Sequence, residues 1–280
     1  MRVADAWHGG GELRAQVCAS TAGAAAICRV VEFDGRKRST TVGLTPPRGG
    51  VWGVEATTRW QKLRAETVVA PGRARLLATG DSEIQGIDEI LAASLRGRAD
   101  VKSDAHVSTG ISKPFMFDWN AHARGMADGF RPDVTVVYIG GNEGFPLPRP
   151  KDGRSVNCCG GDWIAGYERR VADMMRSFSR GGRGRVYWFT LPTPSSGELA
   201  GIVAAVNPAI VRAARRFPDT VRVIDIRPVF TPGGHFRSAM EYDGRWVTVR
   251  ESDGYHLSWS GNEIATSLLI RAMRADGAVG

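Results

Sequence analysis

The alternation of strand-like and helix-like apolar patterns after residue 73 is the feature that most restricts the fold. Short β-branched runs such as "DVTVVYIG" (133–140) are separated by segments in which apolar residues recur every three or four positions. Strands that alternate with helices form a parallel sheet covered by helices on both faces. We therefore predict an α/β domain over residues 73–280 whose sheet strands include 74–79, 133–140, 185–190 and 221–226.

Residues 1–72 carry a different pattern. They contain short alternating stretches such as "ICRVVEF" (27–33) and "STTVGL" (39–44), which predict a few β-strands or hairpins. The turn-forming residues "APGR" (70–73) mark the end of this stretch. We expect a β-rich N-terminal segment or small accessory domain, followed by the α/β domain.

Composition excludes some classes of protein. The chain is 42% hydrophobic, as globular proteins are, and no apolar stretch approaches the ~20 residues that span a bilayer. Its formal net charge of +8 suits a nucleic-acid binder, but the sequence has no helix-turn-helix, zinc-finger or RRM signature. We expect no nucleic-acid partner, and a basic surface that could attract acidic glycans or lipid headgroups.

The four cysteines bear on the compartment. Cys18 and Cys28 flank turn-like residues and could pair where the environment is oxidising. Cys158 and Cys159 are adjacent and show neither zinc-site nor C-x-x-C spacing. The first residues, "MRVADAWHGGGELR", lack the apolar core of a signal peptide. The cysteines favour an extracytoplasmic or secreted protein, with the pairing of each left open.

The stretch "LLATGDSEIQG" (76–86) permits two interpretations of Ser82. An apolar strand ends at Gly80, and a helical pattern follows. At the start of a helix, free backbone N–H groups stabilise developing negative charge, which suits a nucleophilic serine. A serine or aspartate that merely caps the helix fits the same residues. The G-x-S-x-G elbow of α/β-hydrolases is absent.

Asp253 and His256 lie three residues apart on a loop before the last predicted helix. A carboxylate at this spacing can hold an imidazole in one tautomer while its other nitrogen faces a serine. An exposed Asp-Gly turn with an incidental histidine is the alternative. His106 and His122 occupy loop-like stretches without a partner pattern, so we interpret them as surface or structural residues.

Two further loops could supply hydrogen-bond donors. Gly-Gly-Asn at 140–142 follows the strongest strand, so the Asn142 amide or nearby backbone N–H groups could bind an oxyanion. A simple strand-terminating turn explains the same residues. Gly110, in "HVSTGISKP", could offer a backbone N–H group.

Taken in order, Gly-Asp-Ser, a loop glycine, Gly-x-Asn and Asp-x-x-His resemble the motifs of the SGNH (GDSL-type) hydrolases over roughly residues 74–280. The resemblance implies a three-layer α/β/α, flavodoxin-like fold. It also implies a Ser82 nucleophile, a His256 base oriented by Asp253, and an oxyanion hole of the Ser82 and Gly110 N–H groups and the Asn142 side chain. "FMFDWN" (115–120) and "DGYHLSWSGN" (253–262) are similar to exported bacterial SGNH-like proteins.

The resemblance implies a serine esterase or deacylase for small acyl esters, acetyl above all, on carbohydrate or cell-envelope substrates, without metal or organic cofactor. An O-acyltransferase with the same triad and a catalytically idle glycan-binding domain are the alternatives. Glu83 departs from the family's leucine, and Glu143 from the aspartate that often follows the asparagine.

Five side chains near these motifs are candidate substrate contacts. Glu83 would add a charge at the mouth of the pocket. Aromatic side chains could stack on sugar rings or line an acyl slot, although core packing is the more frequent role of such residues. The aromatic candidates are Trp119, Phe145, Trp163 and Tyr255.

Overall fold

The computed structural model divides the chain into two compact units, residues 1–72 and residues 73–280. The structure describes residues 2–4, 12–21, 24–34, 39–41, 44, 50–58, 62–69, 73–149 and 151–279.

The first unit holds a four-stranded antiparallel sheet in the order β3-β2-β5-β6, and a separate antiparallel pair of β1 with β4. Val17 and Ala19 on β2 and Val54 and Ala56 on β5 are buried. Alternate residues of a strand face the same side, so these four side chains define one apolar face. The strands are β1 (Arg2–Ala4), β2 (Glu12–Thr21), β3 (Ala24–Asp34), β4 (Ser39–Thr41), β5 (Gly50–Thr58) and β6 (Lys62–Val69).

Both cysteine pairs form disulfides. Cys18 on β2 lies directly opposite Cys28 on β3 in the strand register, and the two are bonded. Cys158 and Cys159 are bonded to each other in the segment between β11 (Ser155–Val156) and α3. The register of the β2–β3 pair accounts for the first bond, because opposed residues bring their Cβ atoms together.

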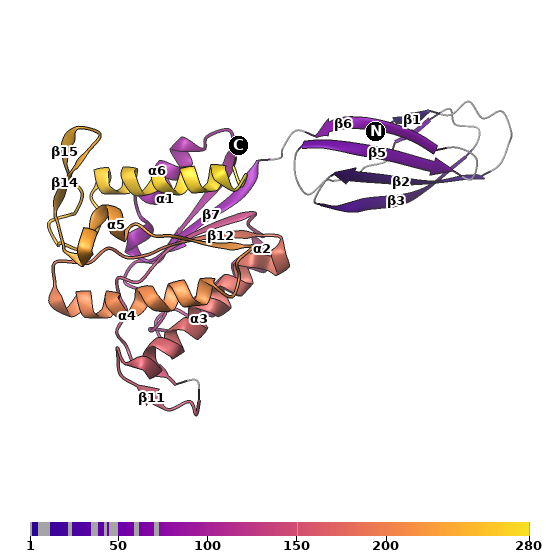
Figure 1. The fold of residues 1–280 in the computed structure, drawn as a ribbon. Coiled ribbons are helices and arrows are strands. Elements are labelled where there is room, and N and C mark those ends of the chain that lie inside the picture. The colour runs from indigo at the N-terminus through magenta and orange to yellow at the C-terminus, as the bar shows by residue number, and fades with distance from the viewer. Residues whose placement is uncertain are drawn as a thin grey trace. The chain divides into compact units, whose positions relative to one another are not determined.

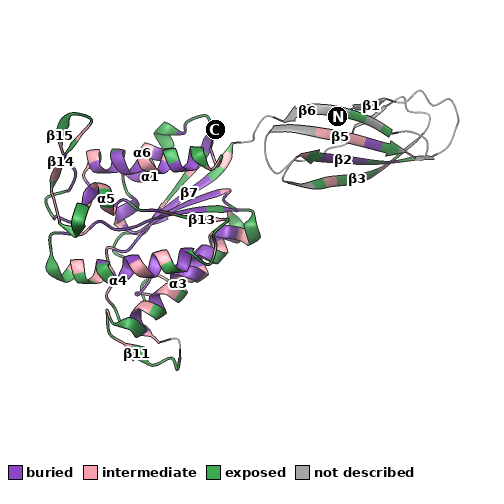
Figure 2. Cartoon of the chain, in the orientation of Figure 1, coloured by how far each residue is buried: buried purple, intermediate pink, exposed green. Residues whose placement is uncertain are grey.

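The second unit is built on a five-stranded sheet in the order β13-β12-β9-β7-β8, with every pair parallel. The three inner strands are almost wholly buried, as the purple colouring in Figure 2 shows. Helices on both faces exclude water from such a sheet, so its inner strands are apolar. The strands are β7 (Ala74–Gly80), β8 (Ala99–Ala105), β9 (Val134–Tyr138), β12 (Arg185–Phe189) and β13 (Val221–Ile224).

Helices cover both faces of this sheet (Figure 1). Helix α1 packs against α6 on one face, while α3 packs between α2 and α4 on the other. The predicted three-layer α/β/α, flavodoxin-like fold is confirmed. The helices are α1 (Ile87–Ser94), α2 (Trp119–Gly129), α3 (Gly161–Ser179), α4 (Gly197–Ala214), α5 (Arg227–Phe230) and α6 (Trp259–Ala275).

Short elements complete the unit. Two hairpins and three short 3-10 helices lie in its loops: β10 (Leu147–Pro148) with β11, β14 (Ala239–Tyr242) with β15 (Arg245–Thr248), η1 (Ser82–Ile84), η2 (Arg180–Gly182) and η3 (Pro232–Gly234).

The strand order places the functional motifs. The chain runs from β7 outward to β8 and then crosses back to β9 on the other side of β7. The carboxyl ends of β7 and β9 therefore flank the topological switch point, where parallel α/β sheets bind their ligands. Ser82 follows β7 and Asn142 follows β9.

Side chains fix two of the helices. Helix α4 runs without interruption through Asn207-Pro208, and the Asn207 side chain bonds both the N–H and the carbonyl of Leu191. The last helix, α6, is capped by Ser258, whose hydroxyl accepts from the Gly261 N–H. Strand β8 and helix α2 were not predicted, because "ADVKSDA" and "WNAHARGMADG" are mostly polar or small.

By length and apolar composition, α4 alone among the described helices could cross a membrane. Its apolar residues instead contribute to the core of the second unit: Val203, Val206 and Ile210 are buried there. Packing against α3 explains the apolar composition of α4.

We predict opposite effects of two glycine substitutions. A Cβ at Gly80 would overlap the carbonyl oxygen of Tyr138 and lie 2.8 Å from its carbon, where β7 meets β9. Gly80→Ala should therefore lower the free energy of unfolding by at least ~3 kcal/mol. Gly125→Ala, in α2 with open space around it, should raise that energy by about 0.5–1 kcal/mol. Urea unfolding followed by tryptophan fluorescence measures both, and equal effects would contradict the packing at Gly80.

Candidate active site

The buried carboxylate of Asp81 joins the ends of β7 and β9. Its Oδ1 accepts from the Glu83 N–H at 3.0 Å and caps η1. Its Oδ2 accepts from the Gly140 and Gly141 N–H groups, both at 3.0 Å, and from Asn142 Nδ2 at 3.4 Å. Burial raises the pKa of Asp81, and these donors oppose the rise. Asp81 therefore fixes the position of the next residue, Ser82.

A continuous hydrogen-bond chain runs from Ser82 through His256 to Asp253. Ser82 Oγ lies 2.8 Å from His256 Nε2, and His256 Nδ1 lies 2.6 Å from Asp253 Oδ2. Asp253 Oδ1 also accepts the N–H groups of Tyr255 and His256. Burial works to raise the pKa of Asp253, but the bond from His256 and the two backbone bonds lower it below its ordinary value. The residues predicted for a triad therefore meet.

Arg250 holds the loop that carries this pair, a role that the sequence did not indicate. It is 3% exposed and donates to the carbonyl of Tyr255 and, at 3.0 Å, to that of Thr193. The Ser195 N–H donates to the Gly254 carbonyl at 3.0 Å. These hydrogen bonds join the loop after β12 to the loop before α6, which carries His256.

Gly110 lies against Asn142. A Cβ at Gly110 would be 2.9 Å from the Asn142 carbonyl oxygen and 3.2 Å from Glu143 Oε2. The buried Glu143 carboxylate accepts the Ile111 and Ser112 N–H groups, both at 2.7 Å. The two loops that carry the predicted oxyanion donors are therefore joined by Glu143. An amide has two hydrogens, so the Asn142 bond to Asp81 leaves one for a ligand.

Glu83 lies beneath the site and not at its mouth, which corrects the sequence prediction. It is 4% exposed, and its Oε1 lies 3.5 Å from His256 Nε2 without a hydrogen-bond partner. Burial raises the pKa of Glu83 well above its ordinary value and the Asp81 carboxylate adds to the rise, while Arg250 and Tyr138 oppose it. The Glu83 side chain therefore lies next to His256 and not at the surface, where the sequence prediction places it.

The aromatic candidates divide into two groups. Trp119 and Trp163 are fully packed: their indole N–H groups donate to Thr109 Oγ1 and to the Phe145 carbonyl, so both belong to the core and not to a substrate pocket. Tyr255 is 8% exposed, and its ring lies against Gly141 beside His256. Phe145 is 38% exposed and remains available to a ligand.

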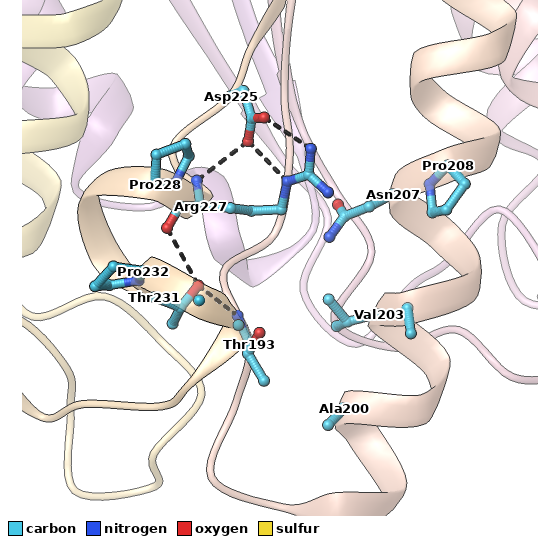
Figure 3. A pocket seen from close by; sticks show the side chains of 13 residues that line it. Thr193, Ala200, Val203, Asn207, Pro208, Asp225, Arg227, Pro228, Thr231 and Pro232 are labelled. Atoms are coloured by element: carbon cyan, nitrogen blue, oxygen red, sulfur yellow. Dashed lines mark hydrogen bonds and ion pairs between the residues drawn. The ribbon is translucent and has the colours of Figure 1, made fainter.

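A cavity lies beyond the ends of strands β12 and β13 (Figure 3). This cavity, of about 700 Å³, lies between α4 and the α5 region. Arg227 and Asp225 line it but bond to each other, Nε to Oδ1 and Nη2 to Oδ2 at 2.7 Å each. Thr193, which Arg250 holds, also lines it. Because the charges of Arg227 and Asp225 are paired with each other, a ligand in this cavity would meet mainly apolar side chains. These are Ala200, Val203 and three prolines.

The raised pKa of Glu83 predicts a pH-dependent stability difference. The folded chain keeps this proton to a higher pH than the unfolded chain, so the stability it contributes is complete below the ordinary pKa of 4.5 and is lost as pH rises through the raised value. Glu83→Gln has no proton to lose. The melting temperature of this variant should equal that of the wild type near pH 4 and exceed it at about pH 8.

Thermal unfolding at intervals between these pH values measures the difference. Glu89→Gln, an exposed change on α1, is the matched control and should follow the wild type throughout. A Glu83→Gln difference that stays constant with pH would contradict the raised pKa.

The chain is similar to several solved structures. The peptidoglycan O-acetyltransferase A (OatA) catalytic domain of Streptococcus pneumoniae is 15% identical, with a TM-score of 0.47, over 75% of this chain and 97% of its own. A catalytic mutant of the acetylxylan esterase Axe2 from Geobacillus stearothermophilus is 13% identical, with a TM-score of 0.50, over 72% and 95%. A GDSL-like lipase from Bacteroides thetaiotaomicron is 12% identical, with a TM-score of 0.48, over 72% and 88%.

No curated protein matches the sequence. The predicted likeness to the SGNH (GDSL-type) hydrolases holds for the fold alone, which the acetylxylan esterase structure shares at a TM-score of 0.50. Residues 75–272 match a defined protein family over more than half of the chain. The chain belongs to that family, which is described as "Protein of unknown function (DUF459)".

Proposed function

We propose that this chain is a serine esterase that hydrolyses small acyl esters through an acyl-enzyme. The observation that carries the proposal is the unbroken chain from Ser82 Oγ to His256 and on to Asp253, at the ligand-binding edge of a parallel sheet. A serine hydroxyl needs an adjacent base, and the base needs an orienting group. Here Ser82 would supply the hydroxyl, His256 the base and Asp253 the orienting group.

In the first step His256 Nε2 takes the proton of Ser82 as Oγ bonds to the carbonyl carbon. The carbonyl oxygen becomes an oxyanion, which the Ser82 and Gly110 N–H groups and the Asn142 amide would hold. The tetrahedral intermediate collapses as His256 gives the proton to the departing alcohol, leaving an ester on Ser82. Water, deprotonated by His256, then releases the acid.

Acetyl or similar small esters on carbohydrate are the proposed substrates. An exposed apolar patch borders the two oxyanion loops: Phe115 is 72% and Phe145 38% exposed, with ring centroids 5.8 Å apart. Phe145 N–H donates to Ser112 Oγ, which places this ring beside the Gly110 loop. Exposed apolar patches of this kind mark binding surfaces, and aromatic rings pack well on the apolar faces of sugars.

We also propose an extracytoplasmic location. The two disulfides, Cys18–Cys28 and Cys158–Cys159, suit an oxidising compartment. The net charge of +8 would favour contact with acidic cell-envelope polymers.

Labelling with a fluorophosphonate probe tests the nucleophile. Wild type should be labelled at Ser82, and Ser82→Ala should not be labelled and should lose about 10⁴-fold or more in kcat on 4-nitrophenyl acetate. Asn142→Ala should lose ~10²–10³-fold. Ser94→Ala, an exposed serine at the end of α1, should behave as wild type. Equal labelling of Ser82→Ala, or none of wild type, would refute the proposal.

Product analysis separates hydrolysis from transfer to an alcohol. With an acyl donor and a glycan acceptor together, hydrolysis predicts free acid as the product. An acylated glycan as the main product would instead identify an O-acyltransferase that uses the same residues.

Phe145→Ala tests the carbohydrate surface. Loss of one stacking ring should raise KM for an acetylated polysaccharide by about 3–10-fold, and leave the kinetics with 4-nitrophenyl acetate within about twofold. Trp246→Ala removes a more exposed ring from the β14–β15 hairpin and should leave the kinetics with both substrates unchanged. A parallel fall in kcat for both substrates would show that Phe145 positions the loop and does not contact sugar.

A further inference from the structure

A second cluster of chemically active side chains lies outside the Ser82 site. Asp104 near the end of β8, His106 just after it and His122 in α2 come together, with one potential ligand atom from each within 4.8 Å of the others. Both histidines were expected to be surface or structural residues. The sequence alone indicates no partner for either, because β8 and α2 lack a clear apolar pattern.

The same nitrogen of both imidazoles faces one carboxylate. His122 Nε2 lies 2.7 Å from Asp104 Oδ2, and His106 Nε2 lies 3.3 Å from Asp104 Oδ1. Zinc binds histidine nitrogen and carboxylate oxygen at about 2.0–2.2 Å, so neighbouring ligands of a tetrahedral zinc ion stand roughly 3.3 Å apart. The two nitrogen–oxygen distances are close to this value, and all three ligand atoms lie within 4.8 Å of one another.

Packing holds the three groups in this arrangement. The His106 ring stacks on Phe117 with centroids 4.1 Å apart, and the His122 ring lies 4.9 Å from that same ring. Thr79 Oγ1 donates to Asp104 Oδ2 at 2.7 Å and orients the carboxylate. Such supporting contacts fix the ligands of metal sites in proteins.

The cluster is also open to solvent on one side. The side chains of His106 and His122 are 30% and 21% exposed, and that of Asp104 is 10% exposed. An ion could therefore enter without rearrangement of the core, and a water molecule could complete its coordination.

We propose that Asp104, His106 and His122 bind one divalent transition-metal ion, with zinc as the best match to two imidazoles and a carboxylate. A ligating imidazole is neutral and presents a lone pair, so on binding each Nε2 exchanges the hydrogen that it shares with Asp104 for the ion. That hydrogen is relocated to Nδ1 by way of solvent if the imidazole is neutral beforehand, and leaves to solvent if the imidazole is protonated. The cysteines of both pairs are disulfide-bonded and do not compete as thiolate ligands.

The ion would tie the end of β8 to the first turn of α2. The segment between them carries Gly110. Thr109 Oγ1 donates to the His106 carbonyl at 2.6 Å and accepts from Trp119 Nε1 at 3.1 Å, so Gly110 follows directly on this network. Zinc would therefore stabilise the loop that offers the Gly110 N–H, without taking part in chemistry at Ser82.

The test uses the full chain, stripped of metal with a chelator and desalted. Isothermal titration with zinc chloride should give one ion per chain, and zinc should raise the melting temperature. His122→Gln and Asp104→Asn should each weaken zinc binding by at least ~100-fold while melting close to wild type in chelator. Cobalt(II) should give wild type a visible absorption band that both variants lack.

Two controls locate the ion. His235→Ala, an exposed histidine outside the cluster, and His256→Ala, at the Ser82 site, should both bind zinc as wild type does. Absence of zinc binding by wild type, unchanged binding by both cluster variants, or loss in His256→Ala would overturn the proposal. None of these readouts depends on ester hydrolysis, so the outcome is separate from that of the proposed function.

Discussion

The buried Asp81 carboxylate is the interaction on which the site depends. A carboxylate without donors is costly to bury, and Asp81 obtains its donors only where the ends of β7 and β9 lie side by side. Gly80 allows that approach, because any side chain there would overlap Tyr138. The direction of Ser82 is therefore determined by sheet pairing and not by its own loop, which explains how a short turn can hold this side chain in place.

The fold could be predicted because it follows from strong local patterns, whereas the motifs of the site were weak singly and were assigned by their order and its resemblance to the SGNH (GDSL-type) hydrolases. Apolar runs identified the inner strands, and parallel strands bring their carboxyl ends to one edge, so Ser82 and Asn142 had to lie near each other. The Asp253–His256 pair meets Ser82 because the loop that carries the pair reaches the same edge of the sheet. Strand β8 was missed because an edge strand is partly exposed and so lacks an apolar run. Asp104, which it carries, was missed with it.

Side-chain burial was harder to predict because it depends on contacts that are distant in sequence. Trp119 and Trp163 have their polar atoms satisfied by Thr109 and the Phe145 carbonyl, which no local pattern indicates. Glu83 follows the nucleophile directly, a position that suggests exposure, yet the 3-10 turn directs it under His256. Arg250 has no motif at all, and only its bonds to Thr193 and Tyr255 reveal its role.

The buried acids beneath Ser82 give the molecule two opposed electrostatic regions. The chain as a whole carries +8, so its surface would attract polyanions. Near Ser82, however, Asp81 and Asp253 place two carboxylates around Ser82 and His256, while burial raises the pKa of Glu83 and favours its uncharged form. An acyl group with its own negative charge would be repelled there, whereas an uncharged one would not. Under the proposed function, this arrangement would favour uncharged acyl groups at Ser82, carried on polymers that the basic surface attracts.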